Sequence, residues 1–378
     1  MIENSIKISF VGDFCSKSPK KIKLSNSIKE VLEGCNSNVL NFEGPLAKGD
    51  LNIPNKTILN QSDFSPEWCE QNNFNIISLA NNHALDFGEK GLLETKKEFK
   101  KATVLGAGNW TQAYDINILE IDSCKIGFIA AASSDFASLK DPWTDKSKIG
   151  SAWINSIEVN NLIVKNKNNC DFIFVISHGG LEYMNLPLPE WRDRYRELID
   201  LGADAVIGSH PHVPQGVEVY KNKPICYSLG NFYFDNNSNK LPKFWDNGLM
   251  VIFLIKNRSL NFEVIPTIRN GHEIGVDKSN KTLKHLEKNS KILYNDEEYI
   301  NEVNKEVLRL YPKYYSWLIN GFNAVEINYN LKTLLKILYK FIFRKSSQNL
   351  KSSMHQIREE STRWALQRAL KIKTKSNL

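Results

Sequence analysis

Two histidines separated by a single residue, His210 and His212, have the clearest potential for chemistry in this chain. They follow a short apolar run, Ala205–Ile207, which the pattern predicts to be a buried strand ending at Gly208. Pro211 restricts the backbone between them, so both imidazoles can face the same space. Imidazole is the commonest metal ligand among protein side chains. The pair therefore indicates a metal site if the chain supplies further ligands, and an ordinary polar loop if it does not.

Further ligands do stand at the ends of other predicted strands. Apolar or alternating runs at residues 6–11, 38–43, 75–80 and 171–176 lead to Asp13, Glu43, Asn82 and His178. Asp13 could instead be a turn residue, but it shares its strand-end position with the others, so we favour a ligand. A mixed set of oxygen and nitrogen ligands favours Mn, Fe or Zn over Ca. Six ligands are enough for two adjacent divalent metal ions if one carboxylate bridges them.

The remaining pattern indicates an α/β protein. Helices are predicted over residues 89–101, with Leu92, Leu93 and Phe99 as the buried positions, and over residues 190–201. Additional strands are predicted at residues 125–131, 224–229, 249–255 and 260–265. Strands alternate with helices, and several strands are apolar on both faces, which is typical of sheets covered by helices.

The pattern of residues changes from strand-like to helical near residue 275. We divide the chain into an α/β domain at residues 1–275 and a helical, basic C-terminal region at residues 276–378. Within that region, apolar residues recur at helical spacing over residues 331–342 beside a stripe of lysines, and a separate helix is predicted over 358–375. This tail has two interpretations. It packs on the body, on another subunit or on an assembly partner, or it lies on an anionic membrane surface as a peripheral contact.

Charge and composition limit the function classes. The chain carries a net charge of +7, but 12 Lys and Arg against two Glu lie from Asn328 onward, so the body is mildly acidic. A mildly acidic body argues against a nucleic-acid-binding core. The six cysteines are scattered without a C-x-x-C pair and are expected to be free thiols. No signal peptide or membrane-spanning run is found, which predicts a cytoplasmic location, peripheral to the membrane if the tail binds it.

Six segments resemble, in order, the motif series of the CapA family of poly-γ-glutamate capsule synthesis proteins, a branch of the calcineurin-like metallophosphoesterase superfamily. The segments are Gly12–Asp13, Asn41–Glu43, Ser78–Gly88, His178–Tyr183, Gly202–His212 and Tyr227–Phe232. The resemblance covers roughly residues 6–270. It implies a four-layer α/β/β/α metallophosphoesterase sandwich with a dinuclear metal centre at the sheet edges, here followed by the C-terminal helical extension.

The resemblance also implies roles for individual residues. Asp13, Glu43 and His212 would hold the first metal, and Glu43 would bridge to a second metal held by Asn82, His178 and His210. His83 would be the general acid, or the group that stabilises the charged phosphoryl oxygens. Glu182 and Tyr183 would orient ligands or bind substrate. Asn231 is either a plain turn residue or part of the site lining.

Two positions depart from the superfamily pattern. Metallophosphoesterases begin with D-x-H, whereas here Cys15 occupies the histidine position, and they bridge with aspartate, whereas here the residue is Glu43. Cys15 is either a thiolate ligand for Zn or Fe or a small buried apolar residue, and we favour the second interpretation. Asp86, just before a predicted helix, is expected to cap it. The histidines outside the motifs, His272, His285 and His355, are expected at the surface.

The function predicted from these features is a metal-dependent hydrolase of the metallophosphoesterase type. It would act in the biosynthesis of a capsule or surface polymer, poly-γ-glutamate-like or polysaccharide, on a small-molecule or polymer substrate that carries a phosphate. A metal-bound hydroxide would attack, with His83 assisting. The first alternative is a non-catalytic component of a capsule polymer synthesis or export assembly that keeps the fold and a partial metal site. The second is a metal-dependent amide or glycopeptide hydrolase.

Overall fold

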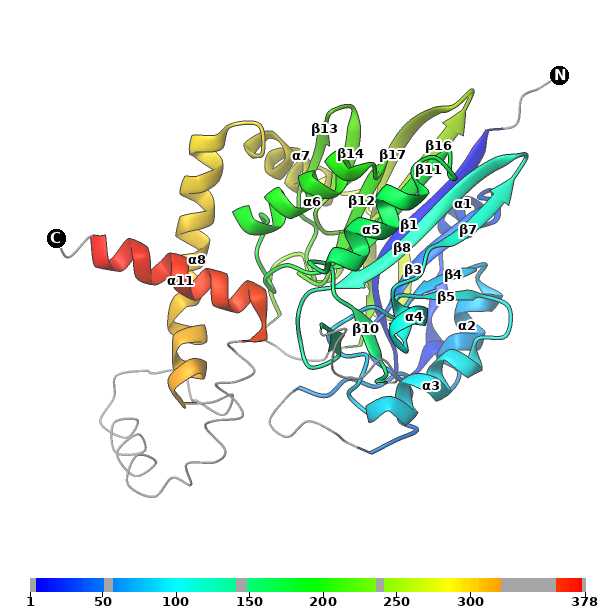
Figure 1. The fold of residues 1–378 in the computed structure, drawn as a ribbon, viewed down its shortest axis with the longest axis horizontal. Coiled ribbons are helices and arrows are strands. Elements are labelled where there is room, and N and C mark those ends of the chain that lie inside the picture. Colours follow the sequence, from blue (N-terminus) through cyan, green and yellow to red (C-terminus); the bar gives the residue numbers. More distant parts are fainter. Residues whose placement is uncertain (1–4, 51–56, 141–147, 236–240, 321–357, 376–378) are drawn as a thin grey trace.

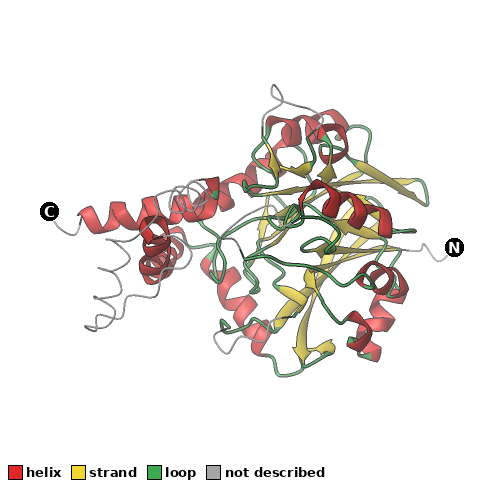
Figure 2. Ribbon diagram, turned by 90° about the horizontal axis from the view of Figure 1, so that it is seen from below, coloured by secondary structure: helices red, strands yellow, loops and turns green. Residues whose placement is uncertain are grey.

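Two β-sheets face each other in the centre of the molecule, and helices cover the outer face of each sheet (Figures 1 and 2). The structure is a computed structural model that describes residues 5–50, 57–140, 148–235, 241–320 and 358–375. Their arrangement in four layers confirms the predicted α/β class and the α/β/β/α order.

The first sheet is built around β1 (Ile6–Cys15), which lies between parallel β3 (Ser37–Phe42) and antiparallel β16 (Asn247–Lys256). Its order is completed by β2 (Lys23–Leu24), β18 (Glu273–Val276) and β17 (Ser259–Asn270) on the β16 side, and by β4 (Ile76–Ser78) and β5 (Thr103–Leu105) on the β3 side. A further strand, β15 (Asn231–Phe234), pairs with the end of β1.

The end of β1 differs from the sequence prediction. The strand was predicted over residues 6–11, but it continues to Cys15 with an irregular register around Asp13. A Cβ atom at Gly12 would lie 1.8 Å from the carbonyl oxygen of Gly230, so only glycine allows β15 to approach this closely. This irregular stretch delivers the Asp13 side chain to the sheet edge.

The second sheet has a parallel centre. Its order is β13 (Val217–Tyr220), β14 (Lys223–Cys226), β12 (Ala205–Ser209), β11 (Phe172–His178), β8 (Cys124–Ala132) and β7 (Asn117–Ile121). Strands β12, β11 and β8 run in one direction, so their carboxyl ends share an edge. A small sheet beside it contains β6 (Ala107–Gly108), β10 (Gly150–Ala152) and β9 (Ser138–Leu139).

Alternation along the strands divides the core into layers. Phe128 of β8 and Phe174 of β11 face the first sheet, where their rings lie 6.4 and 5.4 Å from that of Phe10. The neighbouring residues Ile129 and Val175 point the other way, into the layer beneath the helices. Burial of each such side chain stabilises the fold by roughly 1.5–3 kcal/mol. The two sheets are therefore held together by an aromatic layer in the middle of the sandwich.

Helices complete the outer layers. The 3-10 turn η1 (Pro19–Lys21), α1 (Asn26–Glu33), α2 (Ser65–Gln71) and α3 (Gly88–Glu98) lie on the side of the first sheet, and α4 (Trp110–Ala113), α5 (Ile157–Asn166) and α6 (Pro189–Leu201) on the side of the second. The prediction of a buried Leu93 is wrong, because its side chain is 43% exposed. The buried stripe of α3 runs through Gly91, Leu92 and Thr95, and Leu93 lies beside it.

After β18 the described elements are helices α7 (Lys281–Ile292), α8 (Asp296–Asn320) and α11 (Glu360–Lys375). Helix α11 crosses α8, and both share a buried apolar cluster with α6 (Figure 1). The helix expected over 358–375 is present, whereas the one expected over 331–342 lies outside the described residues. None of the helices in the described part of the chain is long and apolar enough to span a bilayer.

Candidate metal centre

Five buried side chains meet where the ends of the two sheets come together. Asp13 lies in the irregular end of β1, and Glu43 directly follows β3. His178 is the last residue of β11, and His210 and His212 follow β12. None of the five is more than 5% exposed. The sheet edges thus bring together residues that are far apart in the sequence.

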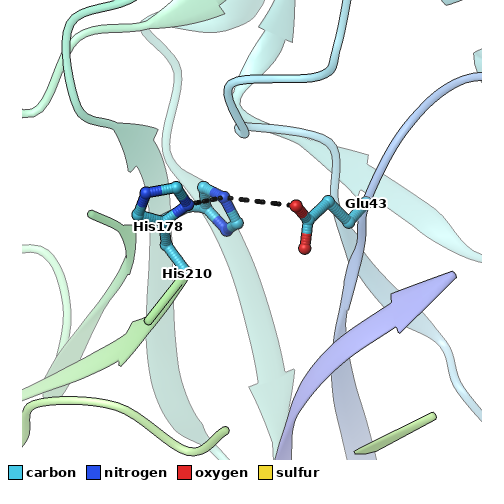
Figure 3. Close-up of side chains that lie close together, drawn as sticks. All are labelled: Glu43, His178 and His210. Carbon is cyan, nitrogen blue, oxygen red and sulfur yellow. Dashed lines mark hydrogen bonds and ion pairs between the residues drawn. The ribbon is translucent and has the colours of Figure 1, made fainter. Parts of the chain in front are cut away.

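These residues form two groups that share Glu43. In the first, Glu43, His178 and His210 each offer one ligand atom, and these atoms lie within 4.8 Å of one another; the second, with the same limit, contains Asp13, Glu43 and His212. Figure 3 shows the two imidazoles of the first group on one side and the Glu43 carboxylate facing them. Asn82 joins this group, because its Oδ1 lies 2.9 Å from Nε2 of His178. The structure therefore brings together all six residues put forward as ligands, with Glu43 common to both sets.

The residues present fit divalent cations. Both carboxylate oxygens of Glu43 are buried, and within the described residues neither accepts a hydrogen bond. Nδ1 of His210 lies 3.1 Å from Nε2 of His178, so two ring nitrogens converge on the space that Asn82 and Glu43 also face. A buried carboxylate that accepts no hydrogen bond is costly, and a cation would remove that cost. The donor set, carboxylate plus imidazole plus amide oxygen, suits Mn, Fe or Zn.

The electrostatics of the site follow from burial and close contact. Burial lowers the pKa of His178 and of His210, so both rings are neutral and have a lone pair to offer. Burial opposes protonation of His212 as well, but Glu43 and Asp13 raise its pKa to about 10. The pKa of Glu43 is raised well above its usual value, mainly by burial. Burial acts to raise the pKa of Asp13, but contacts with His178 and His212 hold it well below its usual range.

Neighbouring polar groups orient the imidazoles. Oδ1 of Asn231 lies 3.0 Å from Nδ1 of His212, and Nδ2 of Asn231 donates to the carbonyl oxygen of Trp245. Asn231 therefore contacts a candidate ligand and opens β15, so it is not a plain turn residue. Ser209 Oγ lies 3.2 Å from Nδ1 of His178, so it contacts the ring on the side away from Nε2, the nitrogen placed to act as a ligand.

Two orienting residues were not singled out in the sequence. Asn41 donates to Oδ1 of Asp13 at 2.7 Å, and its Nδ2 is 3.1 Å from Nδ1 of His178. Ser209, described above, immediately precedes His210. Both lie inside the motif segments, so their position next to predicted ligands could have identified them from the sequence.

The loop that carries the histidine pair has a strained backbone. His210 and His212 adopt positive φ angles of 98° and 58°, and Tyr183 on the facing loop has φ 66°. The amide of Tyr183 donates to the carbonyl oxygen of Pro211 at 2.9 Å, which ties the two loops together. Residues other than glycine rarely adopt positive φ angles, so contacts with neighbouring groups must hold these three residues in their conformations. The strain fixes the directions of the two imidazoles.

Asp86 pairs with His83 and does not cap a helix. Nδ1 of His83 lies 2.6 Å from Oδ2 of Asp86, which also accepts a hydrogen bond from the amide of Leu59. The expectation that Asp86 caps α3 is wrong, because the cap position is Phe87, and Asp86 instead contacts His83 and Leu59. On its other side, Nε2 of His83 is 3.9 Å from Oε1 of Glu43. His83 thus lies at the edge of the centre with its far nitrogen held by a carboxylate.

If the centre hydrolyses phosphoesters, as the sequence predicts, replacing Asp86 with asparagine should lower kcat by about tenfold or more with metal content unchanged. The amide keeps the shape but does not stabilise a protonated His83. Steady-state kinetics on a phosphoester, with elemental analysis of the same sample, measures both quantities. Asp122→Asn, at an exposed turn, is the matched control. An unchanged kcat would show that His83 works without this partner.

The other residues considered from the sequence lie further from the ligand groups. Cys15 is 3% exposed, packs with Phe234 and Trp245, and belongs to neither ligand group. Burial raises the pKa of its thiol well above the usual value, as for a buried apolar residue. The Tyr183 ring is tilted by 36° against that of His212, with ring centroids 6.3 Å apart, and the Glu182 carboxylate raises the pKa of the Tyr183 hydroxyl.

The histidines outside the motifs were expected at the surface. His272 is exposed. The prediction fails for His285, which is half-buried, because its ring stacks on Phe244 at 4.0 Å and its Nε2 lies 3.0 Å from the carbonyl oxygen of Pro214. His355 lies outside the described residues.

Comparison with known proteins places this site in a family. Residues 7–236 match the family described as bacterial capsule synthesis protein PGA_cap, and these residues make up more than half of the chain. The chain belongs to this family. The matched range of the PGA_cap family includes all six candidate ligands, His83 and Asn231, and it ends before the C-terminal helices.

Two Bacillus proteins show how far the similarity extends. The capsule biosynthesis protein CapA of Bacillus anthracis is 31% identical over 241 residues, covering 60% of this chain and 56% of that protein. The PGA biosynthesis protein CapA of Bacillus subtilis (strain 168) is 32% identical over 235 residues, covering 60% of each. The chain therefore spans less than two thirds of the length of either PGA_cap relative. A solved putative 5'-nucleotidase from Staphylococcus aureus is 17% identical with a TM-score of 0.46, covering 75% of this chain and 58% of that one.

Proposed function

We propose that this protein is a metal-dependent hydrolase of the phosphoesterase type that acts in the synthesis of a bacterial capsule or surface polymer. The observation that carries the proposal is the Glu43 carboxylate, which is buried without a hydrogen bond from any described residue and is shared by two sets of ligands. A carboxylate in this position suits a bridge between two cations. Membership of the PGA_cap family supports the role in capsule synthesis.

Residues of this chain would hold the metals as two overlapping sets. Asp13, Glu43 and His212 would form one set, and Glu43, Asn82, His178 and His210 the other. When bound, two divalent cations would acidify a water molecule and neutralise the negative charge of a phosphoryl group. Asn231 and Ser209 would keep His212 and His178 in the orientations that their ring nitrogens require.

His83 would supply the acid. With Nδ1 held by Asp86, the protonated ring can donate from Nε2 to the oxygen of a leaving group, and the carboxylate stabilises the positive charge that the ring carries before transfer. The burial of His83, 6% exposed, limits the access of bulk water to this proton. Positioning and charge stabilisation together account for most of the catalysis expected at such a centre.

Reconstitution tests the proposal. Protein freed of metal and reloaded with Mn, Fe or Zn is expected to retain about two ions per chain, and to hydrolyse phosphoesters in a reaction that a chelator abolishes. Elemental analysis and a panel of phosphoester substrates measure the two outcomes separately. One ion or none would contradict the dinuclear centre. Two ions without hydrolysis of phosphoesters, amides or glycopeptides would favour the non-catalytic role in a polymer assembly.

A further inference from the structure

The ring of Tyr183 lies between the candidate metal centre and helix α8. Its centroid is 6.3 Å from that of the candidate ligand His212 and 6.0 Å from that of Trp245. From α8, Nζ of Lys313 lies 5.1 Å from the centroid of the same Tyr183 ring. A single aromatic side chain therefore contacts both the candidate centre and a lysine of the C-terminal helices.

Helix α8 is fastened to the loop that carries Tyr183. The amide and the side-chain Nδ2 of Asn185 donate to the Glu306 carboxylate at 2.9 and 2.5 Å. The hydroxyl of Tyr299 donates to the carbonyl oxygen of Pro187 at 3.0 Å. Glu306, Tyr299 and Lys313 all belong to α8. The hydrogen bonds of Glu306 and Tyr299 therefore hold the helix, and Lys313 with it, beside the loop.

Basic and acidic side chains both lie around Lys313 on the two crossing helices. Residues 307–320 of α8 and 361–375 of α11 contain no Asp or Glu and carry Arg309, Lys313, Arg363, Arg368, Lys371, Lys373 and Lys375. Acidic groups lie here as well: burial together with Glu182 and Glu359 raises the pKa of Tyr314, which adjoins Lys313, and Glu182 raises the pKa of Tyr183. An ammonium group has three N–H donors, so Lys313 can bind an anion of a ligand while it keeps a protein partner.

We propose that Lys313 binds a second anionic group of the substrate, a carboxylate or a phosphate, while the reacting phosphoester lies at the metal centre. The inference rests on the proposed function. A substrate chain that passes the Tyr183 ring would reach from the ligands around His212 to the ammonium. Lys313 lies outside residues 7–236, the part of the chain that matches the family. Selection for the second anionic group would therefore come from the C-terminal helices. Lys313 is thus a positioning residue that discriminates between substrates with one and two anionic groups.

Binding of non-hydrolysable phosphonates tests this without turnover. Calorimetry on the manganese-loaded full-length protein compares methylphosphonate with phosphonoacetate, 3-phosphonopropionate and 4-phosphonobutyrate. The wild type is expected to bind one of the longer phosphonocarboxylates at least about tenfold more tightly than methylphosphonate, as a charge-assisted hydrogen bond would give. Lys313→Met should remove this preference and leave the Kd for methylphosphonate unchanged, and Lys313→Arg should restore it.

Lys305→Met is the matched control, because Lys305 is on the same helix, is exposed and pairs with Glu302. It should keep the preference. A preference that persists in Lys313→Met, or none in the wild type despite methylphosphonate binding, overturns this inference alone. Failure of every phosphonate to bind the wild type overturns the proposed phosphoesterase site, and this inference with it. An equal loss of affinity for all phosphonates in Lys313→Met would show a structural role and also overturn the inference.

Discussion

Replacing His83 with alanine is expected to lower kcat by about 10²–10⁴-fold, the usual contribution of a positioned general acid. The imidazole is held by Asp86 on one side and lies 3.9 Å from Glu43 on the other, so it is placed to deliver a proton at the centre. It does not belong to either ligand group, and metal content should remain nearly intact. Single-turnover kinetics on a phosphoester, together with elemental analysis, separates the two effects.

A substrate with a good leaving group sharpens this test. The defect of His83→Ala should be smaller for an aryl phosphate, whose leaving oxygen needs little protonation, than for an alkyl phosphate. His272→Ala, which removes an exposed histidine, is the control and should leave kcat unchanged. Equal defects on both substrates would assign His83 to stabilisation of the phosphoryl oxygens instead of proton transfer. Undiminished turnover on both would remove it from the mechanism.

Replacing Glu43 with glutamine is expected to abolish high-affinity binding of at least one ion per chain. The amide keeps the size of the side chain but removes the charge that both ligand groups share. In the wild type, metal at a hundredfold excess over its Kd should stabilise the fold by about 2.7 kcal/mol, seen as a rise in melting temperature. In Glu43→Gln this rise should largely disappear.

Thermal melts with and without Mn measure the loss directly, without the need for a substrate. Glu120→Gln, which removes an exposed carboxylate from β7, controls for the change in net charge. If Glu43→Gln bound two ions with undiminished stabilisation, the bridging role would be refuted. If it lost all binding, the two groups would act as one cooperative unit.

The sequence predicted which strand-end residues come together, because parallel strands end at a common edge. His178, His210 and Glu43 each lie at or just beyond the end of a run that is readable as a buried strand, so their meeting point follows from the strand directions. The irregular end of β1 was not predictable in this way. It depends on the approach of Gly230 to Gly12, a contact between segments far apart in the chain.

The partner of His83 was misassigned for a similar reason. An aspartate before a helix is common as a cap, and local sequence favours that role. The structure instead turns residues 81–87 so that Asp86 meets His83 and the amide of Leu59, a residue from another segment. Likewise, nothing local to Tyr183 predicts that Lys313 will lie over its ring. Contacts that depend on loop geometry or on crossing helices are beyond what periodicity encodes.

The order of the elements along the chain has a consequence for biogenesis. The candidate ligands span residues 13–212, and β1, which carries the first of them, pairs on one side with β16 at residues 247–256. During synthesis, Asp13 emerges long before His212. The backbone of Phe10 cannot complete its pairing with β16 until Val251 has been synthesised. Contacts this distant in sequence slow folding. The centre is therefore completed only after β16 has left the ribosome, and any cation is acquired after that point.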